Sequence, residues 1–144
     1  MFTLKIRFAE HLINPDSLEN RMEGGFATGF RFRTRLGYYR SLALSCIKAL
    51  ALTVDGEPVP EAALSFRING KRFLPAQLPD LYAEYWYLLD EAEIQVDRLG
   101  GISEGDHTLA LTLELRSPYM LTGPNRAYAT IDSSDACVLT RRGA

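Results

Sequence analysis

The sequence of 144 residues contains little cysteine and little histidine. Its two cysteines, Cys46 and Cys137, are too few for a disulfide scaffold and are typical of a reducing compartment. Its two histidines, His11 and His107, leave little material for a zinc site or a histidine-based catalytic network. No stretch approaches the roughly 20 apolar residues of a membrane-spanning helix, and the N-terminus lacks the apolar segment of a signal peptide. We therefore expect a cytoplasmic protein without a membrane partner.

The charge balance and the missing motifs exclude further classes of function. Sixteen lysines and arginines stand against 18 aspartates and glutamates, for a formal net charge of −2. This balance argues against binding nucleic acid by neutralising its phosphate backbone. Glycine-rich phosphate loops and the GxSxG, HExxH and CxxC motifs are absent from the sequence. The composition therefore predicts a small domain with no catalytic residues and no metal or other cofactor of its own.

The dominant positive signal is an alternation of apolar and polar residues. Successive side chains of a strand point to opposite faces, so each alternating run predicts a strand with one buried face. Such runs occupy residues 2–8, 30–36, 50–54, 64–68, 94–96 and 109–115. Asp55-Gly56 and Asn69-Gly70 are hairpin signals between runs. We predict an all-β fold for residues 1–144, a single-domain antiparallel β-sandwich of jelly-roll-like type with few or no helices.

Three segments interrupt this pattern. Residues 14–21 are predicted to hold a short helix capped by Asn14 or Asp16. Residues 41–51 fit either a helix with one apolar face or a loop, and we favour a loop or turn that leads into a strand from about Ala49, because the Asp55-Gly56 turn follows at once. The chain from about residue 121 is less regularly patterned, and we predict an irregular tail that covers the sandwich or reaches a partner.

Aromatic and basic residues gather where two of the predicted strands end. Tyr38, Tyr39 and Arg40 follow the 30–36 strand, and Tyr119 follows the long strand that Pro118 closes. Tyrosine and arginine are enriched in interface hot spots, and aromatic rings stack on sugars, so these residues are candidates for a sugar or partner contact. The alternative is that one tyrosine packs in the core and the other caps the end of the sandwich.

The densest aromatic run occupies residues 81–88 and contains the single tryptophan and three of the seven tyrosines. Alternation would send Tyr85 and Tyr87 to one face and Trp86 to the other. An exposed aromatic set usually marks a binding surface, so all three residues are candidates for an interface. The alternative is a core strand with aromatic partners on neighbouring strands.

An arginine row, formed by Arg31, Arg33 and Arg35, lies on one face of the 30–36 strand. Three like charges on one face repel each other unless acids or a partner lie opposite. Acidic residues on neighbouring strands are the simpler explanation, and nucleic acid is the alternative that the overall charge disfavours.

The order of several short segments resembles the small β subunit of bacterial C-glycoside deglycosidases over about residues 24–121. The segments are Gly29-Phe30-Arg31-Phe32, Tyr38-Tyr39-Arg40-Ser41-Leu42, the stretch 52–60, the hairpin 66–71, Tyr85-Trp86, Gly105-Asp106-His107 and Arg116-Ser117-Pro118-Tyr119-Met120. No single segment is diagnostic, and the resemblance lies in the ordered set.

The resemblance implies a division of labour between two chains. A large α subunit, similar to sugar-phosphate isomerase barrels of the TIM type, would carry a divalent metal, which the resemblance implies to be Mn²⁺. The complex would cleave the C–C bond between a 3-oxo-glucosyl group and an aromatic aglycone such as a flavonoid, by β-elimination through an enolate that the metal stabilises. The present chain would be the accessory subunit, inactive alone. Tyr38, Tyr39, Arg40 and Tyr119 would border the aglycone. A carbohydrate-binding module and a purely structural subunit remain as alternatives.

Overall fold

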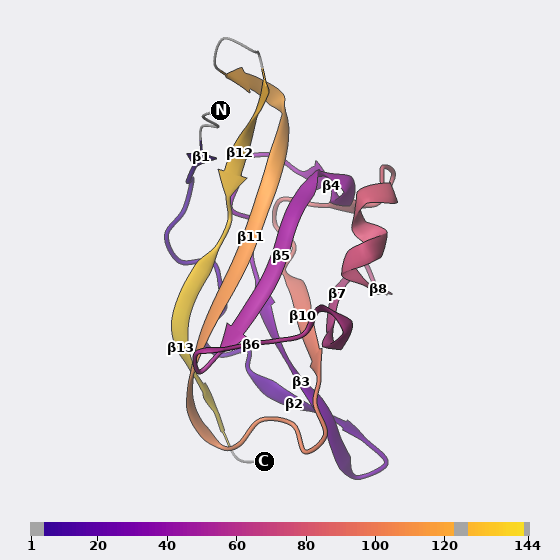
Figure 1. Ribbon diagram of the computed structural model, residues 1–144, viewed down its shortest axis with the longest axis vertical. Coiled ribbons are helices and arrows are strands. Elements are labelled where there is room, and N and C mark those ends of the chain that lie inside the picture. Colours follow the sequence, from indigo (N-terminus) through magenta and orange to yellow (C-terminus); the bar gives the residue numbers. More distant parts are fainter. Residues whose placement is uncertain (1–4, 123–126, 143–144) are drawn as a thin grey trace.

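The computed structural model describes residues 5–122 and 127–142 of the chain, and it is built from β-strands (Figure 1). One sheet has the order β1-β12-β11-β5-β6, and β13 also pairs with β11. Its strands are β1 (Lys5–Ile6), β5 (Ile47–Val54), β6 (Glu57–Pro58), β11 (Gly105–Thr122), β12 (Ala127–Asp132) and β13 (Asp135–Arg141). The prediction of an all-β fold is confirmed.

A second sheet has the order β2-β3-β10-β7-β8. Its strands are β2 (Glu19–Glu23), β3 (Phe26–Thr34), β7 (Leu64–Ile68), β8 (Lys71–Phe73) and β10 (Ala92–Asp97). A short ladder joins β4 (Leu42–Ala43) to β9 (Tyr85–Trp86), and three short 3₁₀ turns connect strands: η1 (Leu44–Cys46), η2 (Glu61–Ala63) and η3 (Pro75–Asp80). No helix among residues 5–122 and 127–142 has the length and apolar character needed to cross a membrane.

The core lies between the two sheets. The apolar positions of the runs 30–36, 64–68, 94–96 and 109–115 are buried, and in Figure 1 the β5 and β11 strands cross in front of β3 and β10. Fully buried side chains come from both layers, among them Phe30, Phe32, Phe66, Ile94, Leu109, Leu111 and Leu113. Burial of this apolar surface is the main favourable contribution to folding.

Both hairpin turns lie where the sequence predicts them. Asp55 and Gly56 have φ values of 50° and 84°, and Asn69 and Gly70 have φ values of 56° and 74°. Positive φ at both central residues defines the two-residue turn whose twist matches that of paired strands. The turns join β5 to β6 and β7 to β8.

Two sequence predictions are wrong. Residues 14–21 do not form a helix, because Asn14 makes a local turn through its own side chain, which accepts a hydrogen bond from the backbone of Asp16 at 3.0 Å, and its backbone bonds to Arg33. The residues from Glu19 instead form β2 on the edge of β3. The backbone bonds offered by β3 therefore outweigh the weak local preference for a helix.

The predicted irregular tail is also wrong for the described residues beyond 121. β12 and β13 follow each other along the same edge of β11. Ser133 and Ser134 break the apolar alternation between them, yet they keep the pairing: Ser133 N–H donates to the Leu113 carbonyl, and Ser134 Oγ accepts from Leu113 N–H, both at 2.9 Å. Residues 123–126 lie outside the described part.

The first predicted strand, 2–8, is described from residue 5, where β1 runs parallel to β12 rather than antiparallel. The strand predicted from about Ala49 begins two residues earlier, at Ile47, after β4 and η1.

Candidate functional site

The segment that carries Tyr38, Tyr39 and Arg40 connects β3 to β4 and passes close to the junction of β12 and β13. Gly37 makes this passage possible. Its N–H donates to Ser133 Oγ at 2.9 Å, and a Cβ at this position would lie 2.8 Å from Leu12 Cδ1. The absence of a side chain therefore lets the connection lie against the sheet and places Tyr38 over β11.

Tyr38 is anchored in the core. Its side chain is 5% exposed, and its hydroxyl lies 2.6 Å from the hydroxyl of Ser117 on β11. Burial raises the pKa of Tyr38 above its ordinary value, and the hydrogen bond with Ser117 opposes part of that rise. Tyr38 is therefore a neutral structural anchor at neutral pH.

Aromatic rings continue from Tyr38 to the surface. The ring of Tyr39 lies 4.5 Å from that of Tyr38, centroid to centroid, and Phe8 packs against both at 5.1 and 5.6 Å. Tyr39 is 51% exposed, so one tyrosine is buried and the other faces solvent. This arrangement agrees with the alternative given above, in which one tyrosine packs in the core and the other lies at the end of the sandwich.

Arg40 and Tyr119 meet at the same place. The guanidinium carbon of Arg40 lies 3.8 Å from the centroid of the Tyr119 ring, within cation–π distance. Arg40 is exposed, and no salt bridge between described residues involves its guanidinium group. We call Phe8, Tyr38, Tyr39, Arg40 and Tyr119 the Tyr38 cluster. The structure thus brings together all four residues predicted for a substrate border and adds Phe8.

The predicted alternation in the dense aromatic run is also present. Trp86 is 1% exposed, packs edge-on against Phe66 at 5.4 Å and donates its indole N–H to the Asp90 carbonyl at 2.8 Å. Tyr85 and Tyr87 stand on the other side, stacked at 6.3 Å and partly exposed. Trp86 therefore belongs to the core, and the two tyrosines to the surface.

Sequence reasoning missed the apolar neighbours of these tyrosines. Leu89 is 94% exposed, and Tyr82 and Leu88 are also exposed. With Tyr85 and Tyr87 they form what we call the 82–89 surface. The pair Leu88-Leu89 lies outside any alternating segment, and this was the sequence signal that could have indicated an exposed apolar surface.

The Tyr38 cluster and the 82–89 surface are joined through the backbone. β4 begins two residues after Arg40 and pairs with β9, so that Leu42 lies opposite Trp86. Ser41 Oγ also accepts a hydrogen bond from Leu88 N–H at 2.8 Å. In Figure 1 β4 lies in the upper part of the molecule, towards the end where β11 ends and β12 begins. Both surfaces therefore belong to one region of the molecule.

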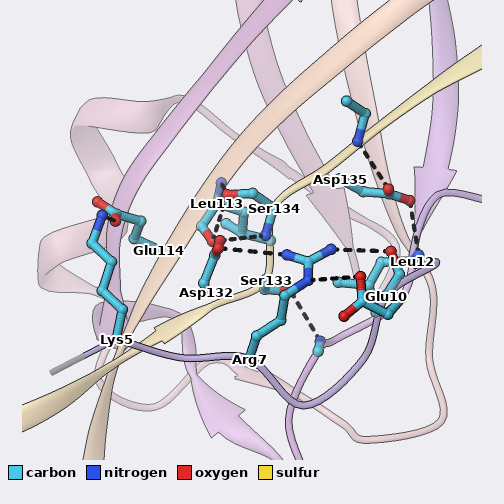
Figure 2. Close-up of polar contacts among 12 residues, drawn as sticks. Lys5, Arg7, Glu10, Leu12, Leu113, Glu114, Asp132, Ser133, Ser134 and Asp135 are labelled. Carbon is cyan, nitrogen blue, oxygen red and sulfur yellow. Dashed lines mark hydrogen bonds and ion pairs between the residues drawn. The ribbon is translucent and has the colours of Figure 1, made fainter.

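An ionic network holds the N-terminal segment that supplies Phe8 (Figure 2). Lys5 pairs with Glu114 at 2.5 Å, and Arg7 lies 3.5 Å from Asp132 and 3.7 Å from Glu10. The hydrogen bond and charge of Glu114 raise the pKa of Lys5. Burial would raise the pKa of Asp132, but hydrogen bonds from Ser134 and the charge of Arg7 lower it on balance.

Further along the same segment, Asp135 fixes the backbone. One carboxylate oxygen of Asp135 accepts the N–H groups of Leu12 and Ile13 at 2.8 and 2.9 Å. Figure 2 shows Asp135 turned towards Leu12, beside the Arg7 and Asp132 pair. The N-terminal segment is therefore held at two places along the β12–β13 edge.

Comparison with known proteins places the chain. Residues 8–119 match the family model of the C-glycoside deglycosidase beta subunit. The chain belongs to this family. The matched range ends at Tyr119 and so includes both the Tyr38 cluster and the 82–89 surface.

Three curated relatives carry names of the same kind. A 3′-dehydrocarminate deglycosidase beta subunit from Microbacterium is 34% identical over 113 residues, which cover 78% of this chain and 81% of the relative. A C-glycoside deglycosidase beta subunit from Arthrobacter globiformis is 36% identical over 88 residues, 61% of this chain and 67% of the relative. One from Eubacterium cellulosolvens is 31% identical over 96 residues, 67% of this chain and 65% of the relative.

The remaining chemistry-bearing residues of this beta-subunit chain are a histidine with structural partners and two free cysteines. His107 Nδ1 lies 2.7 Å from Asp55 Oδ2, and Nε2 lies 2.8 Å from the Ser103 carbonyl, so this histidine ties two turns together. Both cysteines are free thiols: Cys46 is buried, whereas Cys137 is half-buried, and burial raises its pKa. Among the described residues no group of three or more His, Cys, Asp or Glu side chains gathers that could hold a metal ion.

Neighbouring acids account for two members of the arginine row, as the simpler reading predicts, and a backbone carbonyl accounts for the third. Arg31 pairs with Glu19 at 2.9 Å, and Arg33 with Glu91 at 3.4 Å. Arg35 donates to the backbone carbonyl of His11.

Proposed function

We propose that this chain is the accessory β subunit of a heteromeric C-glycoside deglycosidase whose catalytic centre lies in a TIM-barrel-like α subunit. The observation that carries the proposal is the family match over residues 8–119, which includes the clustered residues at one end of the sandwich. The beta-subunit names of the relatives support the existence of a partner chain. On this proposal the chain alone is inactive and works in the cytoplasm.

The proposed reaction is the cleavage of the C–C bond between a 3-oxo-glucosyl group and an aromatic aglycone of flavonoid type. The name of the Microbacterium relative specifies a 3′-dehydro substrate, and a ketone at that position makes the adjacent C–H acidic. Loss of that proton and departure of the aglycone by β-elimination would make the complex a carbon–carbon lyase. The divalent metal, Mn²⁺ in our proposal, belongs to the α subunit, where it would supply charge stabilisation for an enolate.

The Tyr38 cluster is the proposed border of the aglycone pocket. Tyr39 and Tyr119 present partly exposed rings, which suit stacking against a flat aromatic group. Arg40 is exposed beside them, and a guanidinium group suits the phenolic oxygens that accumulate negative charge as the aglycone leaves. Tyr38 would act as a positioning residue, because its buried hydroxyl contacts Ser117 rather than the surface.

The 82–89 surface is the proposed contact with the α subunit. Tyr85 and Tyr87 are partly exposed, and Leu89 is almost fully exposed. Contiguous exposed apolar and aromatic side chains are typical of protein–protein interfaces. Trp86 would support this surface by packing against Phe66 in the core and so fixing the position of the loop.

Co-expression with the α subunit tests the proposal. The complex and each purified subunit would be assayed with a 3-oxo-C-glucoside, and bound metal would be measured in all three samples. We expect turnover by the complex, none by the β chain, and metal in the samples that contain α. Turnover by α alone at the rate of the complex would refute the accessory role. Binding of glycans by the isolated β chain in a pull-down would favour the carbohydrate-binding module instead.

A further inference from the structure

The strand β13 forms an open edge of the first sheet. It pairs with β11 on one side, and no strand of the described chain pairs with its other side. In Figure 1 β13 runs along the left margin of the molecule, with no strand outside it. An open edge presents backbone N–H and C=O groups to any strand that meets it, so this side of β13 can accept a further strand.

The register with β11 shows which backbone groups of β13 point to the open side. Thr108 on β11 lies opposite Val138, but it uses its backbone N–H and C=O for Asp55 at the turn after β5. Thr108 and Val138 are therefore the kind of antiparallel pair that shares no hydrogen bonds, and the N–H and C=O of Val138 point away from β11. By the same alternation the backbone groups of Ala136 and Thr140 also point to the open side.

The interior of β13 lacks the features that usually protect an open edge. Natural edge strands carry charged residues, prolines or bulges that prevent pairing with another chain. In the second sheet, three of the five residues of β2 and two of the three residues of β8 are charged. Residues 136–140 of β13 are Ala-Cys-Val-Leu-Thr, and Val138 is 58% exposed. This edge is therefore suited to pairing, unlike the edges of the second sheet.

The two ends of β13 carry opposite charges. Asp135 is 9% exposed, and its carboxylate accepts backbone N–H groups, but no salt bridge within the described ranges gives it a cationic partner. The Nε atom of Arg141 is buried and has no hydrogen-bond partner in the same part of the chain. Strand alternation places both side chains on the face of β13 that carries the buried Leu139. A buried polar group without a partner is costly, so each of these charges would gain from an opposite one.

We propose that two copies of this chain pair through β13 in antiparallel fashion, with a two-fold axis at Val138. The axis lies at the middle of the strand, so all seven residues of β13 pair. The outward N–H and C=O groups of Val138 then bond to those of Val138 in the second copy, and Ala136 pairs with Thr140. The same register places Arg141 of each copy opposite Asp135 of the other.

The sequence of β13 favours a second copy over a strand of another protein. A two-fold contact requires a self-complementary surface, in which residue i meets residue j and residue j meets residue i. Asp135 and Arg141 meet this requirement, because they lie at equal distances in sequence from Val138 and have opposite charges. The proposal goes beyond the accessory role proposed above and does not depend on it, because the Tyr38 cluster and the 82–89 surface lie on other elements.

The molecular mass of the purified full-length chain tests the proposal. We expect sedimentation to give twice the 16.1 kDa of one chain at high concentration. Val138→Lys would place two lysine side chains opposite each other at the axis, and it should raise the dissociation constant about tenfold or more. Ala51→Lys is the matched control, because Ala51 is also exposed on this sheet but lies on β5, away from the open edge. It should leave the dissociation constant unchanged.

A charge reversal at the end of β13 tests the register. Arg141→Glu would place a second acid opposite Asp135 of the other copy and should also raise the dissociation constant about tenfold. Arg142→Glu changes the net charge equally, but Arg142 follows the last residue of β13, so its effect should be much smaller. Circular dichroism would check that the variants are folded. Equal effects of the two charge reversals would overturn the pairing about Val138.

Amide hydrogen exchange measures the open edge directly. The Thr140 N–H gains a partner only in the dimer, so it should exchange slowly in the wild type and quickly in Val138→Lys. The Leu139 N–H points to β11 and should exchange slowly in both. A wild type that stays monomeric at the highest concentration tested, or a dimer that Val138→Lys leaves intact, would overturn the proposal. A monomeric wild type whose binding to the α subunit is weakened by Val138→Lys would also overturn it, and would assign this edge to the α subunit.

Discussion

The hydroxyl groups of Tyr38 and Ser117 lie 2.6 Å apart in a buried position, and this contact links the β3–β4 connection to β11. Tyr38→Phe removes it and leaves the Ser117 hydroxyl without this partner. We expect a loss of about 1 kcal/mol in the free energy of unfolding, measured by urea denaturation. Ser117→Ala should cost a similar amount, and the double variant should cost less than the sum. Strict additivity would show that the two hydroxyls do not interact.

Arg40 should matter for turnover more than for stability. Arg40→Ala removes a cation–π contact with Tyr119, which accounts for about 0.5–1 kcal/mol of stability at an exposed site. If the cluster borders the aglycone, turnover per assembled complex should fall about tenfold, the loss expected for one charge-assisted hydrogen bond. Arg40→Lys should recover part of it, and Arg33→Ala should have no effect. A lower yield of complex with unchanged turnover would instead assign the cluster a purely structural role.

Leu89 offers a test of the 82–89 surface with a matched control. Leu89 and Leu99 are 94% and 93% exposed, but Leu99 lies in the β10–β11 connection, outside this surface. Leu89→Asp should weaken assembly with the α subunit by about tenfold or more, measured by titration of one subunit with the other. Leu99→Asp should leave the affinity unchanged. Equal affinities for both variants and wild type would place the interface elsewhere.

Asp135 should be among the most sensitive polar residues. Asp135→Ala leaves the buried N–H groups of Leu12 and Ile13 without their acceptor. We expect a loss of about 2–4 kcal/mol in the free energy of unfolding, because two buried donors lose a charged partner. Asp80→Ala, at an exposed aspartate in η3, is the control and should change stability by less than about 0.5 kcal/mol.

The His107–Asp55 pair should make stability depend on pH. Burial by itself would lower the pKa of His107, but hydrogen bonds to Asp55 and to the Ser103 carbonyl raise it above its ordinary value of 6.5. The hydrogen bonds from His107 and Thr108 lower the pKa of Asp55 below 3.8. A carbonyl and a carboxylate on the two ring nitrogens are both acceptors, which favours the doubly protonated ring.

The direction in which stability changes with pH follows from the difference between the folded and unfolded pKa of each group. The contribution of His107 is fully present below pH 6.5 and is lost as the pH rises through its higher folded value. The contribution of Asp55 is present above pH 3.8 and is lost as the pH falls through its lower folded value. Thermal midpoints between pH 4 and 9 should therefore converge for wild type and His107→Gln at high pH. A difference between wild type and His107→Gln that grows above neutral pH would contradict this assignment.

The sequence predicted the core strands well because their pattern is local. Residues 64–68 alternate with period two, and the Asn69-Gly70 turn needs positive φ that asparagine and glycine adopt readily. The same locality explains the two errors. Asn14 resembles a helix cap, but its backbone N–H donates to the Arg33 carbonyl instead. Ser133 interrupts the apolar alternation of the sequence, yet its N–H donates to the Leu113 carbonyl and so keeps the chain paired with β11.

The candidate site was predictable in composition but not in arrangement. Alternation was enough to separate Trp86 from Tyr85 and Tyr87. It could not say which of Tyr38 and Tyr39 is buried, because that depends on Ser117, 79 positions away from Tyr38. Phe8 escaped notice because its place in the cluster depends on the pairing of the N-terminal segment with β12.

The sequence by itself determined the all-β class, the hairpin turns and the set of aromatic residues available for contact, since periodicity and turn chemistry depend on neighbours in the chain. Only the tertiary structure decided which residues meet. Arg40 reaches Tyr119 because the tertiary fold brings the β3–β4 connection and the distant strand β11 to one place. Register is set by burial across the whole sheet, so no local stretch of sequence contains it.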